Sequence, residues 1–490
     1  ADQNGNFSIQ AGLGNVLSIS AVGFVSQDIS VGSHTVLNIA LKPSGSLQEV
    51  VVTALGVKRN KNDLGYAAQT INADVIEKGG QTDALKALSG KIAGIQVTSS
   101  TGTPGGSAYI QLRGANSITG DNQPLFVIDG VPIDNGQNYS GDPSDGSNNV
   151  LFGATNTNRG ADINPDDIES ITVLKGPAAA ALYGIGAANG AIIITTKSGK
   201  AGKMQVDFSS SVTFDKVNRY PGLQNQWVKG SGGAIGTYPS SNRYSWRAKA
   251  DTLLWTGVPN DFDIHGSLVG KSNPNGKIAF VPYDNMRDFF RTAPSFTNSI
   301  SFSGDNNIAT YRVGYTNLYQ NSIVPTQYFQ RNSLSFSGSL NLSEKFKVST
   351  NMNYTRSNSS QPQNGSNTSG IMLGLTRTPI DFDNSNGATN AKDPKAYLFP
   401  VGSEYAGLQR AYRFNGALGI YDNPFWTLNK TPYTTDLNRL IGNVQVDYNI
   451  GAGFSALYRL GSDIYQDNRQ QYYEIGSSEY SGGRIFYDRY

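Results

Sequence analysis

From about residue 204 onward, apolar and polar side chains alternate one by one along the chain. In 333–342 the even-numbered positions are Leu, Phe or Gly and the odd-numbered positions are Ser or Asn. The same alternation recurs in 206–214, 296–303, 309–316, 346–355, 443–450 and 454–460. Successive side chains of a strand point to opposite faces, so the pattern predicts seven strands, each with one apolar and one polar face.

The connections between these segments alternate in length. The tight turns are 304–307, 343–344 and 451–453, and the longer connections are 215–295, 318–330 and 356–436. An antiparallel sandwich with one dry face would explain the alternation but not the loop lengths. Strands of about ten residues with short turns at one end and long loops at the other are typical of an outer-membrane β-barrel. We expect the Ser and Asn faces to line a wet lumen, and Tyr315, Tyr354 and Tyr448 to belong to an aromatic girdle.

The first 203 residues follow other patterns. Residues 1–42 have the pattern of short strands between Gly and Asn turns, which indicates part of a β-sandwich. Residues 43–63 are a linker around the run LQEVVVTALG, which is uncharged at its centre. Residues 64–203 mix helical and strand periods and predict a compact α+β domain. Its expected elements are a helix capped by Thr82 that carries Leu85, Leu88 and Ile92, strands at 109–114, 124–133, 170–176 and 191–196, and a short helix after Pro177.

The number of strands bears on the size of the barrel. An eight-stranded barrel has an interior that side chains already fill, whereas one of about 22 strands can hold a plug. A domain of well over 100 residues precedes the first alternating segment. If 64–203 is a plug, then 204–490 holds only the first strands and loops of an incomplete barrel, and the chain is the N-terminal portion of a longer protein.

Composition argues against most catalytic and nucleic-acid chemistry. Lys and Arg number 39 against 37 Asp and Glu, there is no Cys, and the two histidines, His34 and His265, are far apart. A basic nucleic-acid surface, a thiol site and a histidine-based metal site or catalytic triad are therefore not expected. Asp166, Asp167 and Glu169 follow a proline, which favours helix capping over catalysis. We expect neither an enzyme nor a bound metal or cofactor.

Several stretches together resemble the TonB box and plug of SusC-like, TonB-dependent outer-membrane transporters of the Bacteroidetes type. They are LQEVVVTALG (47–56), ALKALSGKIAGIQV (84–97), IQLRG (110–114), PLFVIDGVPI (124–133) and DIESITVLKGPAAAALYGIGAANGAIIITTKSG (167–199). Residues 1–42, with DQNGNFSI, resemble the end of the carboxypeptidase-regulatory-like β-sandwich that precedes the TonB box in this family.

The resemblance implies a fold, a location and partners. The fold is a membrane β-barrel of about 22 antiparallel strands with an α+β plug domain and an N-terminal carboxypeptidase-regulatory-like β-sandwich. The location is the outer membrane, in contact with its lipids, with the N-terminus in the periplasm. The activity is import of an oligosaccharide or peptide, energised by TonB with ExbB and ExbD, under a SusD-like surface lipoprotein that acts as a lid. Recruitment into a larger outer-membrane assembly or secretion complex is the alternative.

Three sets of residues are candidate sites. An extended segment of this chain can receive force from the inner membrane if it adds as a strand to the sheet of a partner protein. The candidate residues for this TonB-binding segment are Leu47, Gln48, Glu49, Val50, Val51, Val52 and Thr53. We expect these valines to pack against nothing else in the chain. The plug-framework candidates are Arg113, Gly114, Asp129, Gly130, Lys175 and Gly176, for which local turns and a salt bridge are the simpler interpretation.

All four tryptophans lie in the two longest connections. Trp227, Trp246, Trp255 and Trp426 are candidates for contact with a substrate or a lid, because an aromatic face can stack on a sugar ring or anchor a protein partner. The alternative is that they form the cores of these long loops.

Overall fold

The computed structural model describes residues 7–19, 27–32, 36–37, 39–41, 50–52, 58–60, 68–77, 81–99, 101–118, 122–136, 157–199, 204–232, 235, 238–306, 308–361, 363, 366 and 368–490. The chain divides into two compact units, Ala1–Ala68 and Gln69–Tyr490. Within the described residues, no helix has both the length and the apolar character needed to cross a membrane.

The first unit contains two short antiparallel hairpins. Strand β1 (Val16–Ile19) pairs with β2 (Gln27–Ser30), and β3 (Val50–Val52) pairs with β4 (Lys58–Asn60). Two of the short strands expected in 1–42 are therefore present. The assignment of this region to a carboxypeptidase-regulatory-like β-sandwich stays a prediction.

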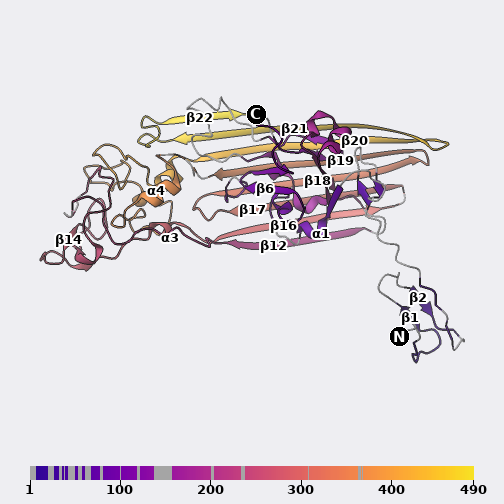
Figure 1. The fold of residues 1–490 in the computed structure, drawn as a ribbon, viewed down its shortest axis with the longest axis horizontal. Coiled ribbons are helices and arrows are strands. Elements are labelled where there is room, and N and C mark those ends of the chain that lie inside the picture. Colours follow the sequence, from indigo (N-terminus) through magenta and orange to yellow (C-terminus); the bar gives the residue numbers. More distant parts are fainter. Residues whose placement is uncertain are drawn as a thin grey trace. The chain divides into compact units, whose positions relative to one another are not determined.

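The second unit begins with a mixed sheet that forms the centre of the predicted plug (Figure 1). Its strand order is β5 (Ala68–Asn72), β10 (Ile168–Leu174), β11 (Ala191–Thr196), β8 (Leu125–Ile128), β9 (Val131–Ile133). The β11–β8 pair is parallel, and β10–β11 and β8–β9 are antiparallel. A separate antiparallel pair joins β6 (Ile95–Ser99) to β7 (Ala108–Leu112). The plug helices are α1 (Ala73–Glu77), α2 (Pro177–Tyr183) and the 3-10 turns Lys86–Leu88, Arg159–Asp162, Pro165–Asp167 and Ile185–Ala187.

The plug differs from the prediction in two places. The helix expected from Thr82 is reduced to the 3-10 turn Lys86–Leu88, which has no side-chain cap at its N-cap residue, Leu85. The Asp83 carboxylate, just before the turn, accepts a hydrogen bond from the Leu85 N–H at 2.8 Å. The segment 124–133 is two strands, because Asp129 and Gly130 turn the chain between them. The helix after Pro177 and the strand at 191–196 form as predicted.

Eight antiparallel strands form the large sheet (Figure 1). Their order is β12 (Gln205–Asp215), β16 (Ala293–Asp305), β17 (Ala309–Asn321), β18 (Tyr328–Ser343), β19 (Phe346–Gln361), β20 (Tyr433–Gly451), β21 (Phe454–Tyr473), β22 (Arg484–Arg489). All seven predicted strands are present, and β22 is an eighth that the alternation did not predict. Most strands run further toward the long loops than expected, so Tyr315 and Tyr354 lie within their strands, whereas Tyr448 is close to a tight turn.

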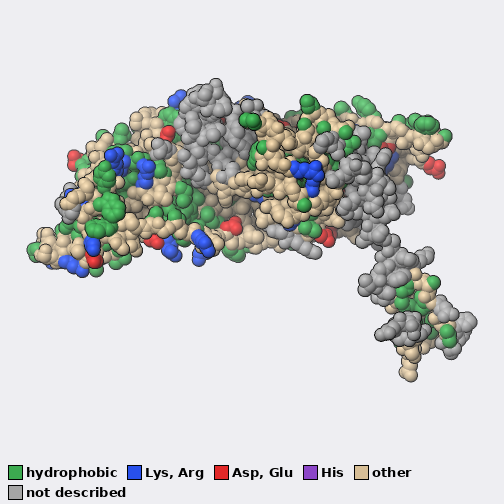
Figure 2. All heavy atoms as spheres, viewed as in Figure 1, with side chains coloured by type: hydrophobic (Ala, Val, Ile, Leu, Met, Phe, Trp, Pro, Cys, Tyr) green, Lys and Arg blue, Asp and Glu red, His purple; other side chains and the backbone are tan. Residues whose placement is uncertain are grey.

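The two faces of this sheet are polar on the inside and apolar on the outside. In β18, Ser333, Ser335 and Ser337 are buried, whereas Leu334 and Phe336 on the other face are 48% and 40% exposed. Exposed apolar side chains, among them Ile450 and Phe454, also lie at the end where the β20–β21 turn lies (Figure 2). Soluble proteins usually bury the apolar face of a sheet, and the reverse arrangement here matches a barrel wall with lipid on its outer face. The large sheet is called the strand wall below. The inner face was expected to line a wet lumen; in the structure much of it lies against the plug.

The two longest connections fold into an ordered lobe at one end of the sheet (Figure 1). Its elements are β13 (Leu253–Trp255), β14 (Leu268–Gly270), β15 (Ile278–Ala279), α3 (Asn285–Phe289), α4 (Ile371–Arg377), α5 (Pro424–Lys430) and the 3-10 turns Ala250–Thr252 and Pro394–Ala396. Both connections contribute to its apolar clusters. In one cluster, Phe262 from the first connection packs with Phe382 and Phe414 from the second.

Candidate functional site

Part of the candidate TonB-binding segment forms a hairpin with the chain that follows it. Val50, Val51 and Val52 pair with Asn60, Arg59 and Lys58, respectively. Leu47, Gln48, Glu49 and Thr53 lie outside the described residues. The backbone of these valines therefore pairs within the chain, whereas the expectation that they pack against nothing else in it stays a prediction.

Asp129 and Gly130 form a two-residue turn between β8 and β9. Ile128 pairs with Val131, and φ is 47° at Asp129 and 82° at Gly130, which is the turn geometry that an Asp-Gly pair favours. The Asp129 carboxylate accepts hydrogen bonds from the Thr196 N–H at 2.9 Å and from its hydroxyl at 2.7 Å. Burial raises the pKa of Asp129 above its usual range, against the lowering effect of these two bonds. The turn thereby ties the β8–β9 hairpin to the end of β11.

The other plug-framework candidates also occupy turns. Arg113 and Gly114 follow β7 with φ of 61° and 94°, and the Arg113 N–H donates to the Gly94 carbonyl at 3.0 Å. Gly176, with φ of 72°, precedes α2, and Lys175 reaches the Gln69 side chain at 3.4 Å. Among the described residues, no ion pair joins Arg113 to Asp129, so the expected salt bridge is not formed. The local turns expected at these positions are present.

The sequence did not predict a buried ionic cluster between the plug and β20–β21. Arg439 of β20 is 1% exposed, and both of its terminal nitrogens donate hydrogen bonds. Nη1 donates to the Asp162 carboxylate at 3.1 Å and to the Arg159 carbonyl at 2.8 Å, both in the plug. Nη2 donates to the Asp463 carboxylate at 2.7 Å and to the Asp134 carbonyl at 3.0 Å. Its Nε donates to Asp463 at 2.9 Å. All five N–H donors of the guanidinium are therefore used.

A second polar contact lies between the plug and β17–β18. Arg312 of β17 pairs with Asp167 of the plug at 2.9 Å, and the Ser335 hydroxyl donates to the same carboxylate oxygen at 2.8 Å. Arg331 donates to the Ala161 carbonyl at 2.7 Å. Asp167 therefore does more than the helix capping expected of it, because it pairs with the strand wall. A signal was present in the sequence, since these two arginines occupy inward positions of strands whose inward faces are otherwise uncharged.

The tryptophans divide into buried and accessible ones. Trp255 and Trp426 are 4% and 2% exposed and pack in apolar clusters of the lobe, and the Trp426 indole N–H donates to the Ser477 hydroxyl at 3.0 Å. Trp227 is half-buried, and Trp246 is 66% exposed with its ring centroid 6.2 Å from that of Trp227. Two of the four thus have loop-core positions, and the other two form a pair that reaches the surface.

A polar contact joins the two connections inside the lobe. The Asp381 carboxylate accepts from the Lys229 N–H at 2.9 Å, and the Lys229 ammonium donates to the carbonyls of Ser240, at 2.9 Å, and Tyr412. Burial lowers the pKa of Lys229 to about 7, against the raising effect of Asp381. The ammonium also lies 4.4 Å from the centroid of the Tyr238 ring. These contacts fix the first connection against the second.

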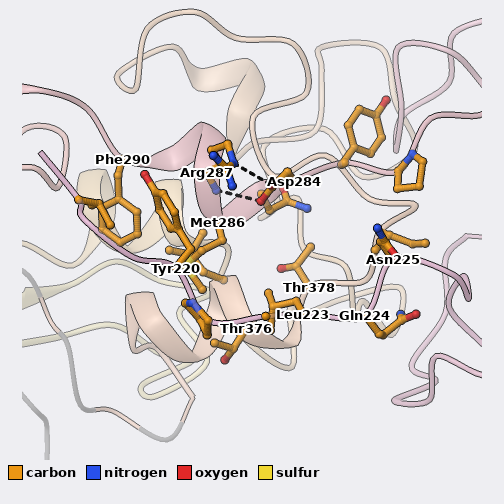
Figure 3. Close-up of a pocket in the computed structure, with 18 of the residues that line it drawn as sticks. Tyr220, Leu223, Gln224, Asn225, Asp284, Met286, Arg287, Phe290, Thr376 and Thr378 are labelled. Atoms are coloured by element: carbon orange, nitrogen blue, oxygen red, sulfur yellow. Dashed lines mark hydrogen bonds and ion pairs between the residues drawn. The ribbon is translucent and has the colours of Figure 1, made fainter.

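A cavity of about 1030 Å³, here called the loop cavity, opens in this lobe (Figure 3). It is lined by residues from 216–225, 282–292 and 375–380, together with Ser245. Tyr220 and Phe290 lie side by side in it, and Arg287 pairs with Asp284 at 3.2 Å. Among the described residues, no group of three or more His, Cys, Asp or Glu side chains could hold a metal ion. The lining of the cavity offers aromatic, polar and charged contacts of the kind that bind organic molecules.

Comparison with known proteins agrees with this architecture. The family model for the TonB-dependent Receptor Plug Domain matches residues 60–191. The TonB-dependent receptor SusC of Bacteroides thetaiotaomicron is 31% identical over 461 residues, which cover 91% of this chain and 39% of SusC. The TonB-dependent receptor P26 of Formosa agariphila is 28% identical over 72% of this chain and 31% of its own length.

A solved structure shows the same fold. The RagAB peptide importer in its open-open state superposes with a TM-score of 0.61 at 18% identity, over 90% of this chain and 46% of that one. The present chain spans less than half the length of these relatives. The plug match, the identity to SusC and the shared fold show that it carries the plug and barrel strands of a SusC-like TonB-dependent receptor.

Proposed function

We propose that the protein imports a nutrient, an oligosaccharide or a peptide, across the outer membrane with energy delivered by TonB. The observation that carries the proposal is the polar contact between the plug and the strand wall. Arg439, Arg312 and Arg331 hold the plug through ion pairs and carbonyl hydrogen bonds. Polar contacts of this kind close the lumen, and water can replace them when the plug moves.

Force has to reach the plug from outside the barrel. In the proposal, TonB, driven by ExbB and ExbD, takes the segment 47–53 as an added strand and pulls on it. The β3–β4 hairpin presents three of these residues in extended form. The pull then reaches the turns at Arg113–Gly114, Asp129–Gly130 and Lys175–Gly176. Several hydrogen bonds between the segment and TonB, each worth about 0.5 to 1.5 kcal/mol, bear the load together and can therefore transmit a pull to the plug.

The loop lobe is the proposed site of substrate and lid contact. Trp246 and Trp227 form an accessible aromatic pair, which can stack on a ligand ring or anchor a SusD-like lipoprotein. The relative that shares the fold is a peptide importer, and SusC is a receptor of the same family. Both support import, with the N-terminus in the periplasm and the lobe at the cell surface.

Deletion of residues 50–53 tests the proposal. Uptake of a radiolabelled nutrient that the wild-type strain depletes is expected to fall to the level of a strain without the gene, with an unchanged amount of protein in the outer membrane. Deletion of 43–46 is the matched control, because it shortens the same linker equally and leaves the segment intact. Normal uptake by the 50–53 deletion would refute energised import through this segment.

Purification in mild detergent tests the lid. A SusD-like lipoprotein is expected to co-purify in equal amount, and its loss on substitution of Trp246 by Ala would assign the aromatic pair to the lid. Recovery of the receptor without any lipoprotein would remove the lid from the proposal.

A further inference from the structure

We propose that the loop cavity binds an anionic oligosaccharide, one that carries carboxylate or sulfate groups. The inference rests on the proposed function and specifies the substrate class. The cavity volume of about 1030 Å³ lies at the upper end of the range of about 300 to 1,000 Å³ that is usual for ligand sites. It therefore has room for several linked rings.

The charges that line the cavity are unbalanced. Four cationic side chains, Lys216, Arg287, Arg291 and Arg377, face one carboxylate, Asp284. Arg287 already pairs with Asp284 at 3.2 Å, so the other three cations have no carboxylate in the lining. Such an excess attracts an anion, and guanidinium groups match the geometry of carboxylate and sulfate oxygens.

Two of these cations are available to a ligand. Lys216 is exposed and makes no hydrogen bond or ion pair with the described residues. The Arg377 guanidinium is exposed and lies 4.7 Å from the centroid of the Tyr421 ring. A guanidinium stacked in this way keeps its N–H groups, which lie in its plane, open to an acceptor. Arg291, in contrast, is partly used, since its Nε donates to the Ser322 carbonyl at 3.1 Å.

The rest of the lining favours a sugar over a peptide. The half-buried Tyr220 ring lies 6.2 Å from the Phe290 ring and offers an aromatic face, and the exposed amides of Asn218 and Asn225 make no hydrogen bond with the described residues (Figure 3). Aromatic faces suit the apolar side of a pyranose ring, and amides suit its hydroxyls. None of the lining residues lies in a strand, so an extended peptide would find no strand edge to pair with.

Calorimetric titration of the detergent-purified, full-length protein tests the inference. The probes are tetragalacturonate, its fully methyl-esterified form and tetraglutamate, at neutral pH and low salt. Tetragalacturonate is expected to bind at least about tenfold more tightly than the uncharged ester, and more weakly when salt is added. It is also expected to bind more tightly than tetraglutamate.

Two substitutions locate the binding. Lys216→Gln and Arg377→Gln are each expected to raise the Kd for tetragalacturonate about 2- to 5-fold, which corresponds to the loss of one exposed ion pair. Lys271→Gln and Arg243→Gln are matched controls outside the lining; both residues are exposed, and Arg243 also lies over a tyrosine ring, at 5.4 Å. The controls are expected to leave the Kd unchanged.

Several outcomes would overturn the inference. They are equal binding of the ester and the acid, tighter binding of tetraglutamate, no binding of any probe, or an equal effect of the cavity and control substitutions. None of them bears on TonB-driven import, because binding by the purified protein requires no energy. If the purified protein does not prefer tetragalacturonate, while uptake is lost in the 50–53 deletion and kept in the 43–46 deletion, the proposed function stands and only the substrate class is rejected.

Discussion

The guanidinium of Arg439 shows how much one side chain contributes to this molecule. It is almost entirely removed from water, and its five donors are divided between two carboxylates and two carbonyls. Three of its acceptors, Asp162 and the carbonyls of Arg159 and Asp134, belong to the plug, and the fourth, Asp463, belongs to the neighbouring strand. A single side chain therefore makes three of the contacts between the plug and the large sheet.

Arg439→Ala is expected to loosen the plug. The substitution leaves the Asp162 and Asp463 carboxylates without their main partner in a buried site, which costs about 3 to 5 kcal/mol. The measurement is the rate at which a protease cleaves the plug in the purified protein, together with thermal unfolding. Arg356→Ala is the control, because its pair with Asp436, at 3.5 Å, is exposed and contributes less than about 1 kcal/mol. Equal protection of both variants would show that the cluster does not hold the plug.

Residue roles were the least predictable feature of the sequence. The turn at Asp129–Gly130 is local, so its two-residue signature could be read directly, although the prediction had placed it inside one strand. The arginines of the large sheet that pair with Asp162 and Asp167 lie more than 140 positions away in the chain, and nothing local indicates such pairs. Arg312, Arg331 and Arg439 could have been noticed, because each is a charged residue between uncharged neighbours on the inward face of its strand, where it needs a partner.

The β8–β9 hairpin is an element whose shape depends on one glycine. Gly130 has a φ of 82°, and a Cβ there would overlap the guanidinium of Arg459, which donates to the Gln445 side chain at 2.9 Å. The hairpin therefore lies close against β21, and a side chain at Gly130 would have to displace the Arg459 guanidinium.

Gly130→Ala is expected to destabilise the plug more than Gly114→Ala. Both glycines have positive φ, so an alanine at either position is expected to cost about 1 to 2 kcal/mol in backbone strain. Only Gly130 adds the displacement of Arg459, because nothing lies within 4 Å of a Cβ at Gly114. Thermal unfolding of the two variants measures the difference, and equal midpoints would contradict the close contact of the turn with Arg459.

The elements were predictable to different extents. The period of two identified seven strands of the large sheet because their outer faces are apolar and their inner faces polar over many residues. The strand β22 was missed, since Arg484–Arg489 is short and carries charges at three of its six positions. The helix expected from Thr82 was overpredicted: Leu85, Leu88 and Ile92 are buried as its spacing implied, but the chain there forms only a 3-10 turn.

On the scale of the molecule, the plug and the large sheet are one compact unit. The plug keeps its own apolar core, to which the sheet contributes only Ile441 among the buried members. Contacts between plug and sheet are mainly polar. The plug therefore has its own folded core and contacts the strand wall mainly through polar side chains. Transport by the proposed mechanism requires part of the plug to move.

A cysteine pair across this contact is expected to block uptake. Asn164 of the plug donates to the Thr316 hydroxyl of β17 at 2.9 Å, so cysteines at these two positions face each other across the contact, and formation of the disulfide is checked before uptake is measured. The chain contains no other cysteine. Under oxidation, Asn164→Cys with Thr316→Cys should lose uptake and recover it with a reductant, whereas each single variant should be insensitive. Full uptake with the disulfide verified by mass spectrometry would show that this part of the plug need not move.

The polar character of the contact between plug and wall has a thermodynamic consequence. Heat-capacity change follows the apolar area brought into water, and polar area lowers it. Withdrawal of an intact plug from the wall exposes mainly Ser, Thr, Asp and Arg side chains, while its Ile, Leu and Val core stays covered. The heat-capacity change of withdrawal is therefore small beside that of unfolding the plug, so the enthalpy and the entropy of opening are nearly independent of temperature and its free energy changes almost linearly with temperature.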